Sequence, residues 1–270
     1  MRSATLLAPC IVLLLGGCSR MARSYYLSGY DRDIRNSTRD IQGARSDAER
    51  AVAYSRRGRA YSEKGRYSRF ARVISDEEYA RLFELAISDH GTAVKLAPAS
   101  GEVYFSRGQT YYDRAAFGDP KDLRPWSTLA TADFQAAAER DATNHLAWDM
   151  LGMAHLQSGE LDEAIRDFTR ETELDSFGRV RLADAYCTRA GVRQREHRDD
   201  AATEDYEKSL SLGAPADSCD CEPYNPLLYL YDHQTRYDKA WEIVAKAKQA
   251  NRWIAPELLD QLKKDSGRIR

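Results

Sequence analysis

The sequence predicts an all-α protein built from repeated pairs of helices. Aromatic, small and ring-bearing residues recur at fixed offsets, and the pattern returns five times between about residues 48 and 250. Small residues suit the points where two antiparallel helices come closest, and rings fill the space behind them. One such match would be weak support for a repeat, whereas five in series predict a helical-repeat array.

The third repeat shows the pattern most completely. Its members in order are Trp148, Leu151, Gly152, His155, Ala164 and Phe168. The same frame begins again at Tyr54, Tyr104, Tyr186 and Tyr224. These offsets resemble those of the tetratricopeptide repeat (TPR) family. The resemblance implies a TPR solenoid wound as a right-handed superhelix, whose inner helices line a concave surface.

A single TPR domain is expected over residues 30–270, and it contains all of the predicted repeats. Residues 30–44 are interpreted as a terminal half-repeat. The repeats are expected near residues 51–98, 101–142, 145–176, 183–214 and 221–250. A capping helix is predicted over 254–265, because a stripe of apolar residues follows Trp253 and Pro256 stands near its start.

The first two repeats exceed the family period of about 34 residues. Their excess predicts two long loops, roughly Gly65–Asp76 and Phe117–Ser127. The second loop contains Trp126, which we expect to be exposed and to contact a partner, because tryptophan is a common anchor of protein interfaces. The alternative is that both insertions are surface decoration, since additional loop length costs little free energy.

The first 17 residues have the layout of a secretory signal peptide. Arg2 precedes an apolar run from Ala4 to Leu15, shorter than the ~20 residues that span a bilayer. The run ends in Leu15-Gly-Gly-Cys18, which resembles a bacterial lipobox. The resemblance implies cleavage before Cys18, a covalent diacylglycerol and acyl lipid on that residue, and a tether over residues 18–29. Ser19 implies sorting to the outer membrane, facing the periplasm. The alternative is an ordinary cleaved signal.

Composition limits the class of partner. The chain has 40 Lys+Arg and 42 Asp+Glu, a formal net charge of −2 at pH 7, which gives no reason to expect nucleic acid. No metal or cofactor other than the covalent lipid is predicted. In an oxidising periplasm, Cys187 could pair with either Cys219 or Cys221.

Arginine and aspartate co-occur at two fixed points of three repeats. Arg57, Arg107 and Arg189 share one position, and Asp89, Asp133 and Asp205 share the other. We interpret them as a bidentate brace between the two helices of each repeat, rather than as an anion site. In the third repeat Leu151 replaces the arginine, so Asp167 is expected to lack an arginine partner.

The helical period predicts which side chains line the concave surface. An apolar centre with polar ends is typical of a groove for a peptide or helix. The predicted groove residues are Phe105, Gln109, Tyr112, Asp149, Met153, Leu156 and Tyr229. Alternatively, some of these rings pack against neighbouring repeats. The Lys/Arg/Asn pattern by which some relatives hold a C-terminal carboxylate is missing.

No catalytic motif occurs in the chain, and His90 and His155 stand at ring positions of the repeats, where packing explains them. The predicted function is that of a non-enzymatic, membrane-anchored adaptor or scaffold that binds a protein or peptide partner. In organisation the chain resembles envelope TPR lipoproteins. The alternative is a pilotin or an assembly chaperone for an outer-membrane complex. A cell-wall binder or an enzyme is a third hypothesis.

Overall fold

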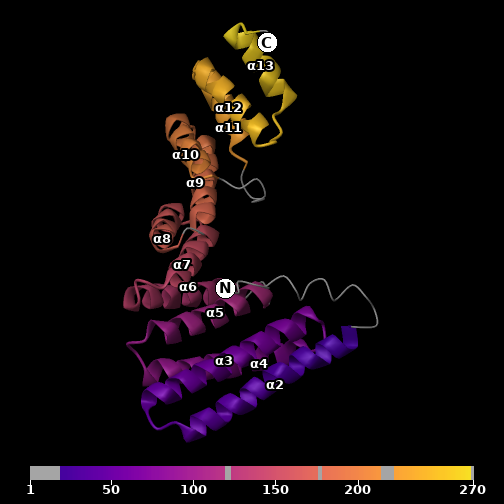
Figure 1. Ribbon diagram of the computed structural model, residues 1–270, viewed down its shortest axis with the longest axis vertical. Coiled ribbons are helices and arrows are strands. Elements are labelled where there is room, and N and C mark those ends of the chain that lie inside the picture. Colours follow the sequence, from indigo (N-terminus) through magenta and orange to yellow (C-terminus); the bar gives the residue numbers. More distant parts are fainter. Residues whose placement is uncertain (1–18, 119–122, 176–177, 214–221, 269–270) are drawn as a thin grey trace. The chain divides into compact units, whose positions relative to one another are not determined.

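The computed structural model describes residues 19–118, 123–175, 178–213 and 222–268, within which every regular element is a helix (Figure 1). The signal peptide over 1–17 and Cys18 lie outside the described residues. The chain divides into two compact units, one up to Ala147 and one from Trp148. The helices are α2 (Ser19–Gly43), α3 (Asp47–Phe70), α4 (Asp76–Leu96), α5 (Gly101–Phe117), α6 (Leu123–Arg140), α7 (His145–Ser158), α8 (Leu161–Leu174), α9 (Gly178–Arg195), α10 (Asp199–Ser211), α11 (Tyr224–His233), α12 (Tyr237–Gln249) and α13 (Pro256–Ser266).

Consecutive helices form the predicted repeats as packed pairs. In the first unit α3 packs on α4 and α5 on α6, and in the second α9 packs on α10 and α11 on α12. Helix α7 meets α8 where Gly152 faces Phe168. Helix α3 begins four residues before the first repeat was expected, at 51, and α9 begins five residues before the fourth was expected, at 183. The all-α, TPR-type fold class predicted from the sequence is confirmed.

Glycine marks the closest approach within a repeat, as the repeat pattern implies. A Cβ atom on Gly108 would lie 2.8 Å from the ring of Phe134, and one on Gly152 would lie 2.7 Å from the ring of Phe168. Both rings are fully buried. Only a residue without a side chain lets the second-helix ring fill the space between the helices at these distances.

The predicted arginine–aspartate braces are confirmed in three repeats. Each guanidinium donates from Nε and Nη2 to the two oxygens of one carboxylate. The distances are 2.7 and 2.7 Å for Arg57–Asp89, 2.7 and 2.7 Å for Arg107–Asp133, and 2.9 and 2.8 Å for Arg189–Asp205. The carboxylates are buried, so each repeat contains a charged pair that joins its two helices.

Two repeats replace the brace in different ways. In the third repeat Leu151 is buried and, among the described residues, Asp167 has no arginine partner, as predicted; instead, His155 donates from Nδ1 to Asp167 Oδ2 at 2.6 Å. His155 is therefore more than the packing residue expected from the sequence. In the fifth repeat the two positions hold Leu227 and Ile243, both buried.

His90 is a packing residue, as expected. Its side chain is fully buried, and a Cβ on Gly58 would lie 2.7 Å from its ring. Burial lowers the pKa of His90 to about 3, so the ring is neutral at physiological pH.

The first of the two long loops predicted from the sequence is wrong, and the segment expected as a tether is helical over its described residues. Residues 19–29 are the first turns of α2, since no proline interrupts them and Tyr26 is held 5.4 Å from the Tyr67 ring. Helix α3 continues to Phe70 and α4 begins at Asp76, because Ser75 accepts a hydrogen bond from the Glu78 N–H and caps it. The first insertion therefore mainly lengthens two helices.

The described part of the second insertion, from Leu123 on, belongs to a helix, and residues 119–122 of the predicted loop lie outside the described residues. Trp126 belongs to the first turns of α6, where Pro125 is tolerated because the first N–H groups of a helix have no partner within it. The indole of Trp126 is half-buried and stacks on Tyr111, with ring centroids 5.8 Å apart. Trp126 therefore packs on its own repeat and is not the exposed loop residue that was predicted.

The last helix closes the second unit. Leu262 of α13 is fully buried, and Ile254, Leu258 and Leu259 pack against the same core, which agrees with the predicted capping helix. Cys187 of α9 is disulfide-bonded. Both partners considered from the sequence, Cys219 and Cys221, lie outside the described residues.

Candidate interaction surface

In the first unit, the predicted groove residues lie on α5. Phe105 is 9 % exposed, and its ring centroid is 5.9 Å from that of Phe134. Gln109 and Tyr112, further along the helix, are half-buried. Phe105 thus packs within its own repeat, because Phe134 of α6 covers it. This differs both from the predicted groove position and from the alternative of packing against a neighbouring repeat.

In the second unit, the predicted groove residues of α7 are half-buried and contact α9. Arg181 forms an ion pair with Asp149, and its guanidinium lies 2.8 Å from the sulfur of Met153. Met153 and Leu156 pack against the core around Phe168. Arg181 belongs to the first helix of the next repeat, and it was not found from the sequence because it occupies no fixed position of the repeat pattern.

Beside this contact lies a carboxyl group with a perturbed pKa. Glu171 of α8 is 4 % exposed. Burial, joined by the negative charge of Asp149 and opposed by Arg181, raises the pKa of Glu171 to about 7. The third repeat therefore holds a carboxyl group that changes charge near neutral pH.

The inner face of the last repeat exposes two large rings. Tyr229 of α11 is 42 % exposed and Trp253, which precedes α13, is 69 % exposed. Asn225 holds the segment of Trp253 against α11: its Nδ2 donates to the Trp253 carbonyl at 3.2 Å and its Oδ1 accepts from the Ala255 N–H at 2.9 Å. Tyr229 follows Asn225 by one helical turn on the same face. We call Asn225, Tyr229 and Trp253 the aromatic face.

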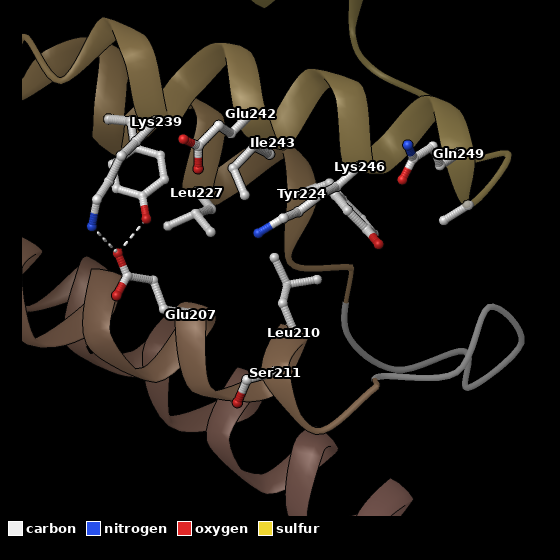
Figure 2. Close-up of a pocket in the computed structure, with 12 residues that line it drawn as sticks. Glu207, Leu210, Ser211, Tyr224, Leu227, Lys239, Glu242, Ile243, Lys246 and Gln249 are labelled. Carbon is white, nitrogen blue, oxygen red and sulfur yellow. Dashed lines mark hydrogen bonds and ion pairs between the residues drawn. The ribbon is translucent and has the colours of Figure 1, made fainter.

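A separate cleft of about 620 Å³ lies between α10 and the α11–α12 pair (Figure 2). Its floor is apolar and its rim alternates acidic and basic side chains. The lining residues are Glu207, Leu210, Ser211, Tyr224, Leu227, Tyr231, Lys239, Glu242, Ile243, Lys246, Gln249 and Ala250. Figure 2 shows the amino group of Lys246 directed into the space above Leu210.

One end of the cleft is fixed by a network around Glu207. Its Oε1 accepts from the Tyr231 hydroxyl and, at 3.1 Å, from Lys239 Nζ (Figure 2). Burial would raise the pKa of Glu207, but the hydrogen bonds from Tyr231 and Lys239 outweigh it and the pKa is lowered. Glu207 therefore stays ionised at neutral pH, and Lys239 is already occupied by it.

Within the described part of the chain, no group of three or more His, Cys, Asp or Glu side chains is placed to hold a metal ion. No described helix is both long and apolar enough to cross a membrane.

A scan against models of known families found no match, and a search of curated proteins found none either. Solved structures similar to the chain include TTC0263, a thermophilic TPR protein of Thermus thermophilus, at 18 % identity over 82 % of this chain and 96 % of that chain (TM-score 0.44). YrrB, a TPR protein with an unusual peptide-binding site, is 14 % identical over 86 % of this chain and 93 % of its own (0.45). Pseudomonas aeruginosa PilF is 16 % identical over 76 % and 86 % (0.40). No function is carried over from proteins this distant in sequence.

Proposed function

We propose that the chain is a lipid-anchored adaptor of the bacterial cell envelope, which binds a protein partner and performs no chemistry of its own. The anchor is the lipid on Cys18, and the site is the outer membrane, facing the periplasm. The proposal of an anchor is supported by the Leu15-Gly-Gly-Cys18 sequence at the end of a short apolar run.

The aromatic face is the observation that carries the proposal of a protein partner. Trp and Tyr are the residues most often responsible for binding energy in protein interfaces, because each buries a large area and loses little conformational entropy. Trp253 is 69 % exposed at a site where Asn225 holds its backbone. An exposed ring whose backbone is held against the helix that bears Tyr229 is suited to bind the apolar side chains of a partner.

Photo-crosslinking in the native envelope tests this proposal. A photoreactive residue would replace Tyr229 on the aromatic face, Lys246 in the cleft, or Glu204, an exposed residue of α10 that serves as the control. We expect a discrete adduct from position 229 and none from position 204. An adduct from position 246 alone would indicate that the partner binds in the cleft and not on the aromatic face. Equal adducts from all three positions, or none, would contradict a specific partner of the second unit.

The anchor has its own test, independent of the partner. Mass spectrometry of the N-terminal peptide is expected to show diacylglycerol and acyl groups on Cys18. Cys18→Ser is expected to move the protein from the membrane to the soluble fraction. An unmodified Cys18 in membrane-derived protein would overturn the anchor and leave the aromatic face in place.

A further inference from the structure

Three apolar side chains are exposed at one end of the first unit. Phe70 is the last residue of α3, Val73 lies in the turn between α3 and α4, and Phe117 is the last residue of α5. Their exposed fractions are 61, 42 and 39 %. We call these three residues the apolar tip. A cluster of exposed apolar side chains marks a surface that contacts another apolar phase or a partner.

The C-terminal ends of α3 and α5, which bear the apolar tip, both contact the ring of Tyr79. The guanidinium of Arg69 lies 4.8 Å from the ring centroid of Tyr79, and that of Arg114 lies 5.1 Å from it. The Tyr79 hydroxyl donates to the Asp113 carbonyl at 3.5 Å. The last turns of α3 and α5 therefore meet on the first turn of α4, which places Phe70 and Phe117 at the same end.

The turn that holds Val73 is fixed by hydrogen bonds. Arg72 has φ 54°, and the N–H groups of Arg72 and Val73 donate to the carbonyls of Arg69 and Ser68, each at 3.0 Å. This is the hydrogen-bonding pattern of a helix C-terminus closed by a left-handed residue. The backbone of Val73 is thus held in one conformation by this turn.

The start of α2 lies at this same end (Figure 1). Helix α2 runs antiparallel to α3, since Tyr26 packs on Tyr67 and Lys64 pairs with Asp31 at 2.8 Å. Ser19 lies seven residues before Tyr26, about 10 Å further along the helix towards this end. Cys18 is attached to Ser19 by one peptide bond, whose Cα atoms are about 3.8 Å apart.

We propose that the apolar tip inserts into the interface of the phospholipid bilayer that holds the Cys18 lipid. This inference rests on the proposed anchor, because the anchor places the start of α2, and with it the tip, against the membrane. Two of the basic side chains at this end are paired with acids: Arg69 with Asp76, and Arg66 with Asp113 at 3.5 Å. Insertion is therefore driven by apolar area, and the acyl chains and the tip together fix the orientation of the first unit.

Quenching by brominated lipids tests the proposal on the full-length lipidated protein. It would be reconstituted into vesicles of phosphatidylethanolamine and phosphatidylglycerol whose acyl chains carry bromine. An indole would be introduced by Phe70→Trp at the tip, and its signal would be taken as the difference from the parent protein, whose four native tryptophans also fluoresce. The matched control is Leu85→Trp, at an exposed apolar residue in the middle of α4. Far-UV circular dichroism checks that both variants keep the helical fold.

We expect bromolipid to quench and blue-shift the indole at position 70 and to leave that at position 85 unchanged. The quenching is expected to persist at about 1 M salt, where charge attraction is screened within about 3 Å. Val73→Ser and Phe117→Ser in the Phe70→Trp background are expected to reduce quenching, because each removes apolar area from the interface.

Two outcomes would overturn the inference. Equal quenching at positions 70 and 85 would show that the tip is not oriented, and absence of quenching at position 70 would show that it faces water or a protein. Mass spectrometry of Cys18 in the same preparation separates the two proposals. If Cys18 is acylated and the indole at position 70 is not quenched, only the proposed insertion of the apolar tip is overturned. If Cys18 is unmodified, the proposed lipid anchor is overturned.

Discussion

The Arg107–Asp133 pair allows a direct measurement of what one brace contributes to stability. Asp133→Ala removes the acceptor of two 2.7 Å charge-assisted hydrogen bonds. Removing one partner of a buried ion pair costs about 3–5 kcal/mol. The Arg107 side chain is 22 % exposed, so water recovers part of that cost. We expect the free energy of unfolding to fall by about 2–4 kcal/mol, which at about 2 kcal/mol per M of urea lowers the midpoint by about 1–2 M.

The fifth repeat supplies the control, because its equivalent residues are Leu227 and Ile243. The double variant Arg107→Leu/Asp133→Ile copies that repeat and leaves no unpaired charge, so it should regain most of the lost stability. The assay is urea unfolding of the full chain followed by far-UV circular dichroism. If Asp133→Ala lowers the midpoint by less than about 0.3 M, or if the double variant is no more stable than the single, the brace does not work as described.

Two further predictions concern pH and packing. The pKa values of His155 and Glu171 are both raised on folding, the second to about 7, so these two groups bind more protons in the folded state and their contribution to the free energy of unfolding should fall as pH rises through about 7. Buried His90, with its pKa lowered to about 3, contributes with the opposite sign below about pH 6.5, so the test is the urea midpoint between about pH 6.5 and 8. Glu171→Gln combined with His155→Gln should flatten this dependence, and an unchanged pH profile would contradict the pKa shifts. Gly108→Ala should cost about 1–3 kcal/mol in the same assay because its Cβ meets the ring of Phe134. Gly91→Ala, inside α4 where a Cβ meets nothing within 4 Å, should instead stabilise, by up to about 1 kcal/mol.

The repeat frame could be predicted from the sequence because it follows from local spacing. Gly108, Gly152 and the aspartates of the braces occupy fixed offsets, so their partners could be named before the structure was known. The lengths of the connections could not be predicted, since an insertion in the frame is equally compatible with a loop or a longer helix. The capping of α4 by Ser75 distinguishes the two, and its Ser-x-x-Glu pattern was present in the sequence.

The interaction surface was predicted less well because it depends on contacts between repeats. The helical period places Phe105 on the inner row, but Phe134 covers it. It also gives no sign that Arg181 reaches Asp149. Trp253 was assigned to the start of a cap, and only the hydrogen bonds of Asn225 show that it lies beside the inner face of α11. Side chains outside the frame therefore define most of this surface.

The variation at the brace positions bears on where a ligand can bind. The carboxylates of Asp89, Asp133 and Asp205 each accept two hydrogen bonds from an arginine of their own repeat, and Asp167 accepts one from His155. Their charge is thus neutralised within each repeat. An anion bound there would have to displace a buried carboxylate from its arginine. The free energy lost by separating that buried pair exceeds the free energy gained from an exposed ion pair. The braces therefore hold the helix pairs in register, and selectivity for a partner must come from side chains that vary between repeats, such as those of the aromatic face.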